Sequence, residues 1–455
     1  MRRLISLARL RRLLNNLQQR YRRVQRPTVL IFSPNDCFPP CHGSHHRCIQ
    51  QIEGISHSCT VYVASSRFTS DVEWPLTKKD SIASAMKYGV SSIFLYEDSL
   101  LGFVEHFIAA IIRRAIPIEG TYQALSKALE SMHEWLMSLW FFQLSLTLNA
   151  SAVIVNYTRW TFLIRLIKKP IKILELHDIL AINTYLGNEI SSALIHSSSS
   201  TLHLLETWPW YIDKTEQLPT FVLNSVKHDI DLINRFDLAW MISPREKRFL
   251  EMMGMQTQCE VIYPSISYNR TLAPKCLPPI LPLGPNAFNA YSLVRFIKNI
   301  LPLVDTSLLR STTILVTGSL GDLSHSFELP PPLSHIGFVD DYLGLLAKCS
   351  LMLAPTGVGT GQQVKIFEAL AVGTPVLAYK ASVPDDILAD NPSIMAARNE
   401  DEYAQYLHNF LSDDSLQAEY VSLAAKSACF CSEVSISNPY SESLRSKLKH
   451  FKCQG

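Results

Sequence analysis

The residues best suited to chemistry lie in one glycine-rich segment in the C-terminal third of the chain. Gly357, Gly359 and Gly361 follow an apolar run that ends at Pro355 and precede an amphipathic stretch that begins near Val364. A strand, a glycine loop and a helix in this order present bare backbone N–H groups at a helix start, where they bind anions and above all phosphate. The sequence therefore predicts a phosphate-binding βαβ unit at this position.

Charged side chains with matching chemistry follow the loop on the predicted helix. Lys365 comes about one turn into the helix, where its amine can reach a phosphate or a sugar hydroxyl. Glu368 follows, and its carboxylate can accept two hydrogen bonds from a vicinal diol such as that of ribose. An ordinary helix with a solvated lysine and an exposed glutamate is the alternative interpretation. The loop would supply N–H groups and a hydroxyl from Gly359, Thr360, Gly361 and Gln362.

Apolar runs typical of buried parallel strands alternate with helical stretches along most of the chain. In the first half we expect strands at 28–33, 60–64, 92–96, 152–156, 171–176, 236–243 and 259–263. A proline-rich passage at 274–285 then precedes further strands at 313–317, 335–338, 350–355 and 376–379. This order predicts an α/β protein with two doubly wound sheets.

The run Glu368-Ala-Leu-Ala-Val-Gly-Thr-Pro-Val376 resembles the donor-site segment of the group 1, family 4-like, glycosyltransferases. That family also carries an acid seven residues before the glutamate. Thr360 occupies this place, and Gly359-Thr-Gly-x-x-x-Lys365 is similar to a variant pattern of the family. Weaker similarities follow in the family's order between residues 28 and 430: Ser33-Pro34 with Gly43-Ser44, Glu175-Leu-His177-Asp178, Ser243-Pro-Arg-Glu246, Gly284-Pro-Asn286 and Gly337-Phe-Val-Asp340.

The resemblance implies two Rossmann-like domains that face a cleft, the GT-B arrangement. On this basis residues 27–272 form an N-terminal acceptor domain and residues 273–430 form a C-terminal domain for the nucleotide-sugar donor. Residues 1–26 are then a basic extension, and residues 431–455 a C-terminal tail.

The resemblance also implies an activity: transfer of a hexose-type sugar from a nucleotide diphosphate sugar, with retention of configuration and without a metal or cofactor. A surface glycan or a lipid-linked sugar is the expected acceptor. Gly43 and Ser44 would approach the diphosphate or the acceptor from the first domain. His177 would face the cleft from a strand end and, with Lys365, is a catalytic candidate.

Two departures from the family keep other functions open. Many relatives carry an Arg and a Lys after the first donor-domain strand, whereas residues 280–289 contain no cation and place Pro282 in that strand. Many also carry a His where this chain has Asn156-Tyr-Thr158. A degenerate GT-B scaffold that binds a sugar nucleotide or a partner is one alternative, and a sugar-nucleotide epimerase or phosphorylase is another.

Charge and cysteine content limit partners and location. The net charge of +2 over 455 residues predicts no nucleic acid partner. Residues 1–26, however, hold nine arginines and no acid, with apolar residues at three- and four-residue steps. Such a helix either lies on an anionic membrane surface, as on the cytoplasmic side of a membrane, or packs on the protein itself. The irregular spacing of the ten cysteines is typical of a reducing cytosol.

Two further patterns bear on a metal site and on a membrane span. The cluster Cys37 to Cys48 contains thiols and imidazoles that can bind zinc, but its spacing matches no standard zinc finger, so we expect no metal. The apolar stretch 136–155 contains Gln143 and Asn149 and divides into a helix and a strand, so we expect no transmembrane helix.

Overall fold

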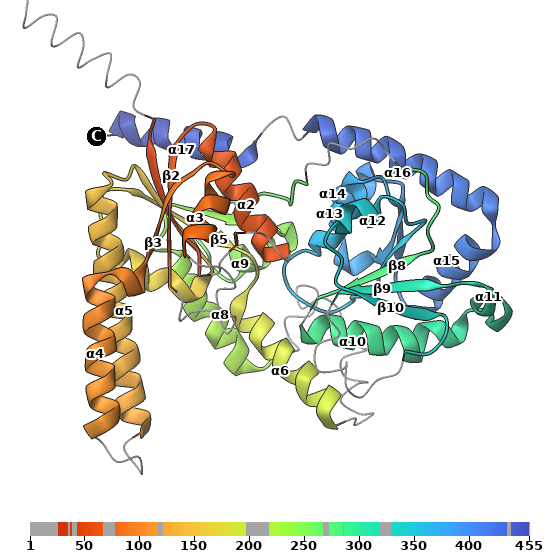
Figure 1. Ribbon diagram of the computed structural model, residues 1–455, viewed down its shortest axis with the longest axis horizontal. Coiled ribbons are helices and arrows are strands. Elements are labelled where there is room, and N and C mark those ends of the chain that lie inside the picture. The colour runs from red at the N-terminus through yellow and green to blue at the C-terminus, as the bar shows by residue number, and fades with distance from the viewer. Residues whose placement is uncertain are drawn as a thin grey trace, which may run out of the picture.

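The computed structural model describes residues 26–34, 37–38, 43–66, 78–115, 122–196, 218–266, 273–284, 286–318, 329–434 and 438–454. It contains two α/β domains side by side, each built on its own parallel sheet (Figure 1). The seven-stranded sheet of the N-terminal domain has the order β3-β2-β1-β4-β5-β6-β7, and the six-stranded sheet of the C-terminal domain has the order β10-β9-β8-β11-β12-β13. The predicted fold class is confirmed.

The central strands of each sheet are short apolar runs that are buried on both faces. In β1 (Thr28–Phe32), Leu30 and Phe32 join one apolar core while Val29 and Ile31 join another on the opposite face. The other strands of this sheet are β2 (Thr60–Ser65), β3 (Val90–Leu95), β4 (Ala152–Asn156), β5 (Ile171–Leu176), β6 (Leu238–Met241) and β7 (Cys259–Val261). The second sheet contains β8 (Ile280–Leu283), β9 (Ile314–Gly318), β10 (Leu333–Gly337), β11 (Met352–Ala354), β12 (Val376–Tyr379) and β13 (Ile394–Ala397).

Helices connect these parallel strands and cover both faces of each sheet. Those of the N-terminal domain are α2 (Gly43–Ser56), α3 (Lys78–Met86), α4 (Leu100–Ala115), α5 (Tyr122–Thr147), α6 (Leu180–His196), α8 (Thr220–Ile233) and α9 (Pro244–Met252). Those of the C-terminal domain are α10 (Ala287–Arg295), α11 (Thr306–Ser311), α12 (Tyr342–Leu346), α13 (Val364–Ala371), α14 (Asp385–Asp390), α15 (Glu400–Ser412) and α16 (Asp414–Val434).

The last helix, α17 (Pro439–Gln454), returns to the N-terminal domain (Figure 1). Tyr440 and Leu444 are fully buried in that domain's core, and the indole of Trp240 in β6 donates a 2.8 Å hydrogen bond to Ser443. The segment expected as a C-terminal tail therefore contains a helix that fixes the end of the chain to the first sheet.

Pro282 lies inside β8, although proline is unusual in a central strand because it lacks a ladder N–H. β8 pairs with β9 along its whole length, whereas its register with β11 includes Ile280 only. Pro282 thus follows the point where the ladder between β8 and β11 ends. Its carbonyl oxygen instead accepts a hydrogen bond from a side chain of the candidate site described below.

The described helices include none that is long and apolar enough to cross a membrane. The stretch 136–155 is the end of α5 followed by β4, as expected from its polar residues. The basic segment 1–26 lies outside the described residues, apart from Arg26.

Candidate active site

The predicted glycine loop connects β11 to α13 and contacts the N-terminal domain. Gly359 and Gly361 have φ angles of 145° and 74°, which side chains rarely permit. A Cβ atom on Gly361 would lie 2.7 Å from the carbonyl oxygen of His177. Glycine is therefore required at 361 for both its backbone conformation and the close approach to the end of β5.

The Gly361 N–H is occupied by a carboxylate from the opposite domain. It donates a 2.7 Å hydrogen bond to Oε1 of Glu246, a buried residue in the first turn of α9. Ser243 caps the same turn by accepting from the Glu246 N–H. The loop thus binds an anionic group at the place where the sequence predicts phosphate, but in this structure the anion is a side chain.

Lys365 is a partly buried lysine whose amine has fixed partners and is withdrawn from water. Its Nζ donates to the carbonyl oxygen of Pro282 at 3.0 Å and to Oδ1 of Asn289 at 2.9 Å. Burial lowers the pKa of Lys365 to about 8, although the charge of Glu368 opposes this effect. The amine therefore lies at the end of β8, the first strand of the C-terminal domain.

Glu368 lies one turn further along α13 and is also buried. Burial raises its pKa to about 7, while the charge of Lys365 lowers it. Within the described part of the chain no group donates a hydrogen bond to its carboxylate. The hydroxyl of Tyr342, at the start of α12, is likewise buried without a hydrogen-bond partner among the described residues. Burial, and then the charge of Glu368, raise the pKa of Tyr342.

Several oxygens of the glycine loop share this lack of partners. Folded proteins seldom leave buried polar atoms unpaired, because each costs roughly 1–3 kcal/mol. The loop places four such atoms within eight residues: Thr356 Oγ1, Thr360 Oγ1, Gln362 Oε1 and Gln363 Oε1 have no hydrogen-bond partner among the described residues. A concentration of this kind is typical of a site for a polar ligand.

His177 lies across from the loop, at the carboxyl end of β5. Its Nε2 is 3.1 Å from Oδ1 of Asn156, and its ring stacks on Tyr157 at a centroid distance of 4.1 Å. Asp178, the neighbour in sequence, instead accepts a hydrogen bond from Asn183. The backbone of His177 therefore lies close to Gly361 of the glycine loop, where the two domains meet. The catalytic role expected for its imidazole stays a prediction.

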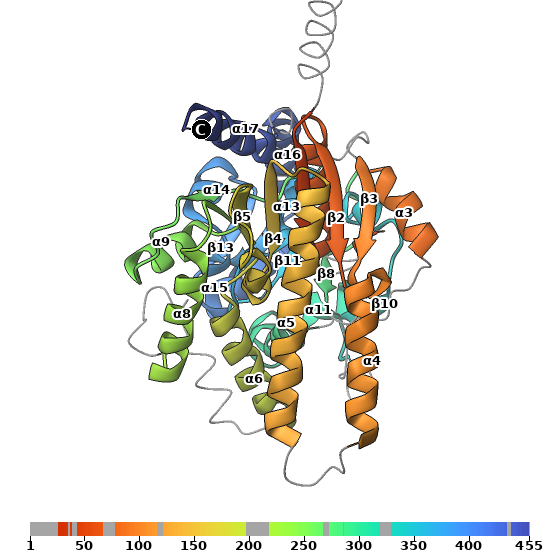
Figure 2. The ribbon, with the colours of Figure 1, turned by 90° about the vertical axis from the view of Figure 1, so that its left-hand side faces the viewer.

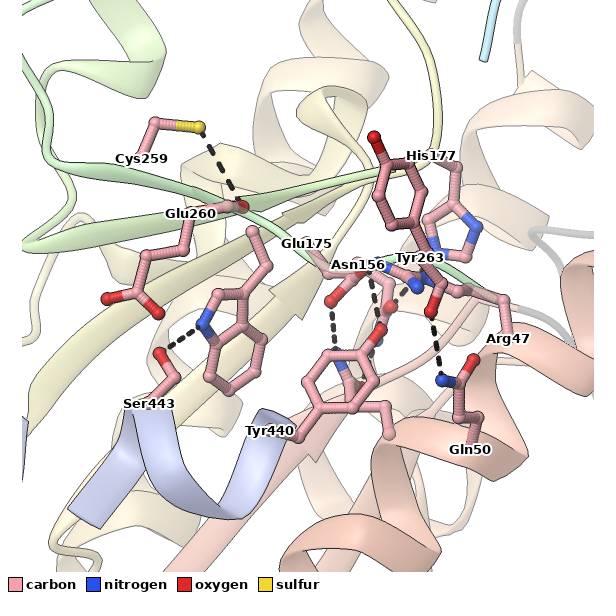
Figure 3. A network of polar contacts seen from close by, with 12 residues as sticks. Arg47, Gln50, Asn156, Glu175, His177, Cys259, Glu260, Tyr263, Tyr440 and Ser443 are labelled. Atoms are coloured by element: carbon pink, nitrogen blue, oxygen red, sulfur yellow. Dashed lines mark hydrogen bonds and ion pairs between the residues drawn. The ribbon is translucent and has the colours of Figure 1, made fainter. Parts of the chain in front are cut away.

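A buried polar network supports this strand end (Figure 3). Glu175, the fifth residue of β5, accepts from Arg47 Nε at 2.8 Å, from Gln51 at 2.9 Å and from the Tyr440 hydroxyl at 3.2 Å. Arg47 belongs to α2, so the network fixes this helix to β5 and α17. The network carries no unpaired carboxylate and is structural.

Gly43 and Ser44 begin α2, four and three residues before Arg47. No described contact joins them to the glycine loop, so their predicted role at the cleft stays a prediction. Nearby, hydrogen bonding from Cys37, with a further contribution from His177, holds the pKa of the Cys48 thiol well below its usual value. The described residues contain no group of three or more metal-binding side chains, and Cys41 and His42 lie outside them.

Polar and aromatic contacts hold the domains together around the site. Arg245 of α9 donates to the carbonyl oxygens of Ala381 and Val383, the latter at 3.3 Å. Tyr263 stacks on Phe367 of α13, and its hydroxyl donates to Asp386 at 2.7 Å. The apolar core of the N-terminal domain includes Val358 from the loop itself.

The sequence alone did not indicate the contacts that Glu246, Asn289 and Tyr342 make in this region.

Comparison with known proteins agrees with this architecture. Residues 283–413 match the family described as glycosyl transferases group 1, whereas no match is found among the curated proteins. Among solved structures, sucrose-phosphate synthase from Thermosynechococcus elongatus is 13% identical with a TM-score of 0.58, covering 93% of this chain and 100% of that one. HepE from Anabaena, in complex with UDP-glucose, is 14% identical with a TM-score of 0.53, covering 92% and 99%. A glycosyltransferase from Rickettsia africae is 13% identical with a TM-score of 0.52, covering 94% and 98%.

Residues 283–413, which make up most of the C-terminal domain, are thus similar to the group 1 glycosyl transferases, and the two parallel sheets have the GT-B arrangement of the solved structures. The resemblance seen in the sequence is therefore confirmed. The similarity to the solved structures concerns the fold, which leaves donor, acceptor and stereochemistry to be argued from the site.

Proposed function

We propose that this chain transfers a sugar from a nucleoside diphosphate sugar to an acceptor hydroxyl, with the donor bound to the glycine loop and α13. The observation that carries the proposal is the position of Lys365. Relatives place cations after the first donor-domain strand, and residues 280–289 contain none. Lys365 comes from a different helix, yet its amine contacts Pro282 in that strand and Asn289 just after it.

The chemistry requires a cation at this place. The diphosphate leaving group gains negative charge as the bond to the sugar breaks, and fixed positive charge and N–H dipoles stabilise it. Because the Lys365 amine is withdrawn from water, its interaction with a phosphate is weakly screened. Lys365 would thus supply the charge that relatives obtain from the strand end, with the loop N–H groups beside it.

Glu368 and Tyr342 would bind the ribose. A carboxylate with no donor of its own can accept both hydroxyls of a vicinal diol, and the unpaired Tyr342 hydroxyl can donate to a ring or hydroxyl oxygen. The loop oxygens without partners would take the remaining polar groups of the donor. Donor binding would also compete with Glu246 for the Gly361 N–H, because one N–H cannot fully serve two anions.

His177 would contact the transferred sugar from the N-terminal domain, since its carbonyl oxygen lies too close to Gly361 to leave room for a Cβ atom there. UDP-sugars are the first donors to test, because the HepE structure contains UDP-glucose. Retention of configuration and a surface-glycan or lipid-linked acceptor follow from the resemblance, and NMR of the anomeric proton of the product tests the former.

Isothermal titration with a panel of sugar nucleotides, beginning with UDP-glucose, tests the donor site. Glu368→Ala should raise the donor Kd about 30- to 150-fold, because two charge-assisted hydrogen bonds contribute about 2–3 kcal/mol. Glu402→Ala is the matched control, since Glu402 is a partly exposed α15 glutamate that pairs with Arg398, away from the glycine loop. An unchanged Kd for Glu368→Ala would show that the ribose binds elsewhere.

One observation favours a second candidate, a GT-B scaffold that binds a ligand without turnover. The Glu246 carboxylate already occupies the Gly361 N–H, and the strand-end Arg of the relatives is absent. This candidate predicts donor binding without release of nucleoside diphosphate in any acceptor mixture. Release of free sugar without an acceptor would instead indicate the epimerase or phosphorylase alternative.

A further inference from the structure

Helices α4 and α5 form a hairpin that projects from the N-terminal domain, and both views show its far end clear of the remaining fold (Figures 1 and 2). The two helices are joined side by side by a 2.8 Å contact between Glu105 and His133. The outer surface of α4 is unusually apolar for an exposed helix. Its exposed large apolar side chains are Leu100, Phe103, Val104, Phe107 and Ile111.

These five residues form one continuous stripe. At about 100° per residue they fall within an arc of about 100° around the helix axis. Phe103 and Phe107 are 66% and 59% exposed, far more than phenylalanine usually is in a folded protein. A stripe of this width with exposed aromatic side chains indicates an interaction surface, because contact of so much apolar surface with water is unfavourable.

The charges of α4 point to the chemistry of the partner. Apart from His106, the only charged residues in its sequence are Glu105, Arg113 and Arg114. Glu105 is held between His133 and the Tyr96 hydroxyl at the α5 side of the helix. The described outer face therefore carries no acid, and the arginine pair ends the helix.

A bilayer fits this face better than a protein does. Protein interfaces carry about one hydrogen bond per 100–200 Å², and the exposed part of α4 offers His106 as its one polar side chain among the described residues. An apolar stripe on a helix whose sequence contains no acid on the described outer face and two arginines near its end is the pattern of helices that lie in the headgroup region of anionic membranes. We propose that α4 docks this protein onto an anionic lipid bilayer through Phe103, Phe107 and their apolar neighbours.

Vesicle flotation of the full chain tests this proposal independently of sugar transfer. We expect binding to vesicles of phosphatidylcholine with about 30% phosphatidylglycerol and weaker binding to phosphatidylcholine alone. Phe103→Ser with Phe107→Ser should lower the partition coefficient at least about tenfold, because each phenylalanine loses its apolar contact with the lipid. Phe103→Leu with Phe107→Leu should retain most of the binding, which separates lost insertion from a damaged fold.

Phe338→Ser is the matched control, since Phe338 is 73% exposed but follows β10 in the C-terminal domain. Equal vesicle binding by the serine double variant and the native chain overturns the proposal, as does absence of vesicle binding by the native chain. Sedimentation velocity tests the other occupant. If the native chain self-associates, the serine double variant does not, and the two bind vesicles equally, a second copy of the chain covers the stripe instead.

Discussion

Replacing Glu368 with glutamine should make the free protein more stable at neutral pH while weakening its binding of the donor. Glutamine keeps the size of the side chain and removes the charge. Burial raises the pKa of Glu368 from an ordinary 4.5 to about 7, so the folded protein binds this proton more tightly than the unfolded chain does. Stability therefore falls as the pH rises from about 4.5 to about 7, and the neutral glutamine escapes this loss.

The size of the effect follows from the two pKa values. Each pH unit between them is equivalent to about 1.4 kcal/mol, so the ionised carboxylate destabilises the fold by about 3 kcal/mol at a pH near 7.5. The attraction to Lys365 is already part of the value of about 7. Glu368→Gln should therefore raise the free energy of unfolding by about 3 kcal/mol near pH 7.5 and by less than about 0.5 kcal/mol near pH 4.5.

Urea unfolding at the two pH values measures both numbers. Glu402→Gln is the control: this carboxylate is exposed, and its partner Arg398 lowers its pKa, so it should show no such gain. Titration with UDP-glucose should at the same time show at least about a tenfold weaker Kd for Glu368→Gln, because one of two strong acceptors is lost. An equal effect of Glu368→Gln at both pH values would refute the buried ionised carboxylate on which the ribose assignment depends.

Two further predictions concern the cation and the basic extension. Lys365→Met should lower kcat/KM with a UDP-sugar by at least about a hundredfold with little change in fold. The donor affinity of the native protein should also decrease as the pH rises through about 8, where Lys365 loses its charge. A Kd that does not change with pH would exclude a role for this charge. Deleting Met1–Arg26 should weaken binding to anionic vesicles without changing the donor Kd, since each arginine near such a surface contributes about 1 kcal/mol; identical vesicle binding by both proteins would show that this segment has no membrane role.

Most strands could be predicted because parallel strands are buried on both faces and become continuous apolar runs. β1, β4 and β5 are clear examples. β13 was not predicted, because Ile394–Ala397 is a four-residue run that contains two alanines and no β-branched residue after the first. Pro282 is unexpected in β8 from the sequence, and the structure shows that the ladder between β8 and β11 ends before the proline.

The site was predicted only where it is local in sequence. The three loop glycines, Lys365 and Glu368 lie within twelve residues, so spacing alone indicates a common purpose. The contact between Lys365 and Asn289 joins residues 76 apart, and that between Gly361 and Glu246 joins residues 115 apart. Sequence periodicity carries no information on such contacts, since they depend on how the two domains meet.

Under the proposed function, the contact between Gly361 and Glu246 would connect donor binding to the relation between the domains. The bond joins the glycine loop of one domain to the first turn of α9 in the other, and α9 also holds the C-terminal domain through Arg245. A phosphate that takes the Gly361 N–H must displace the carboxylate, because two anions on one N–H repel each other strongly in a buried site. The same N–H thus either joins the two domains or binds the donor. This exchange explains how the loop can have the form of a phosphate site while its hydrogen bond is already satisfied.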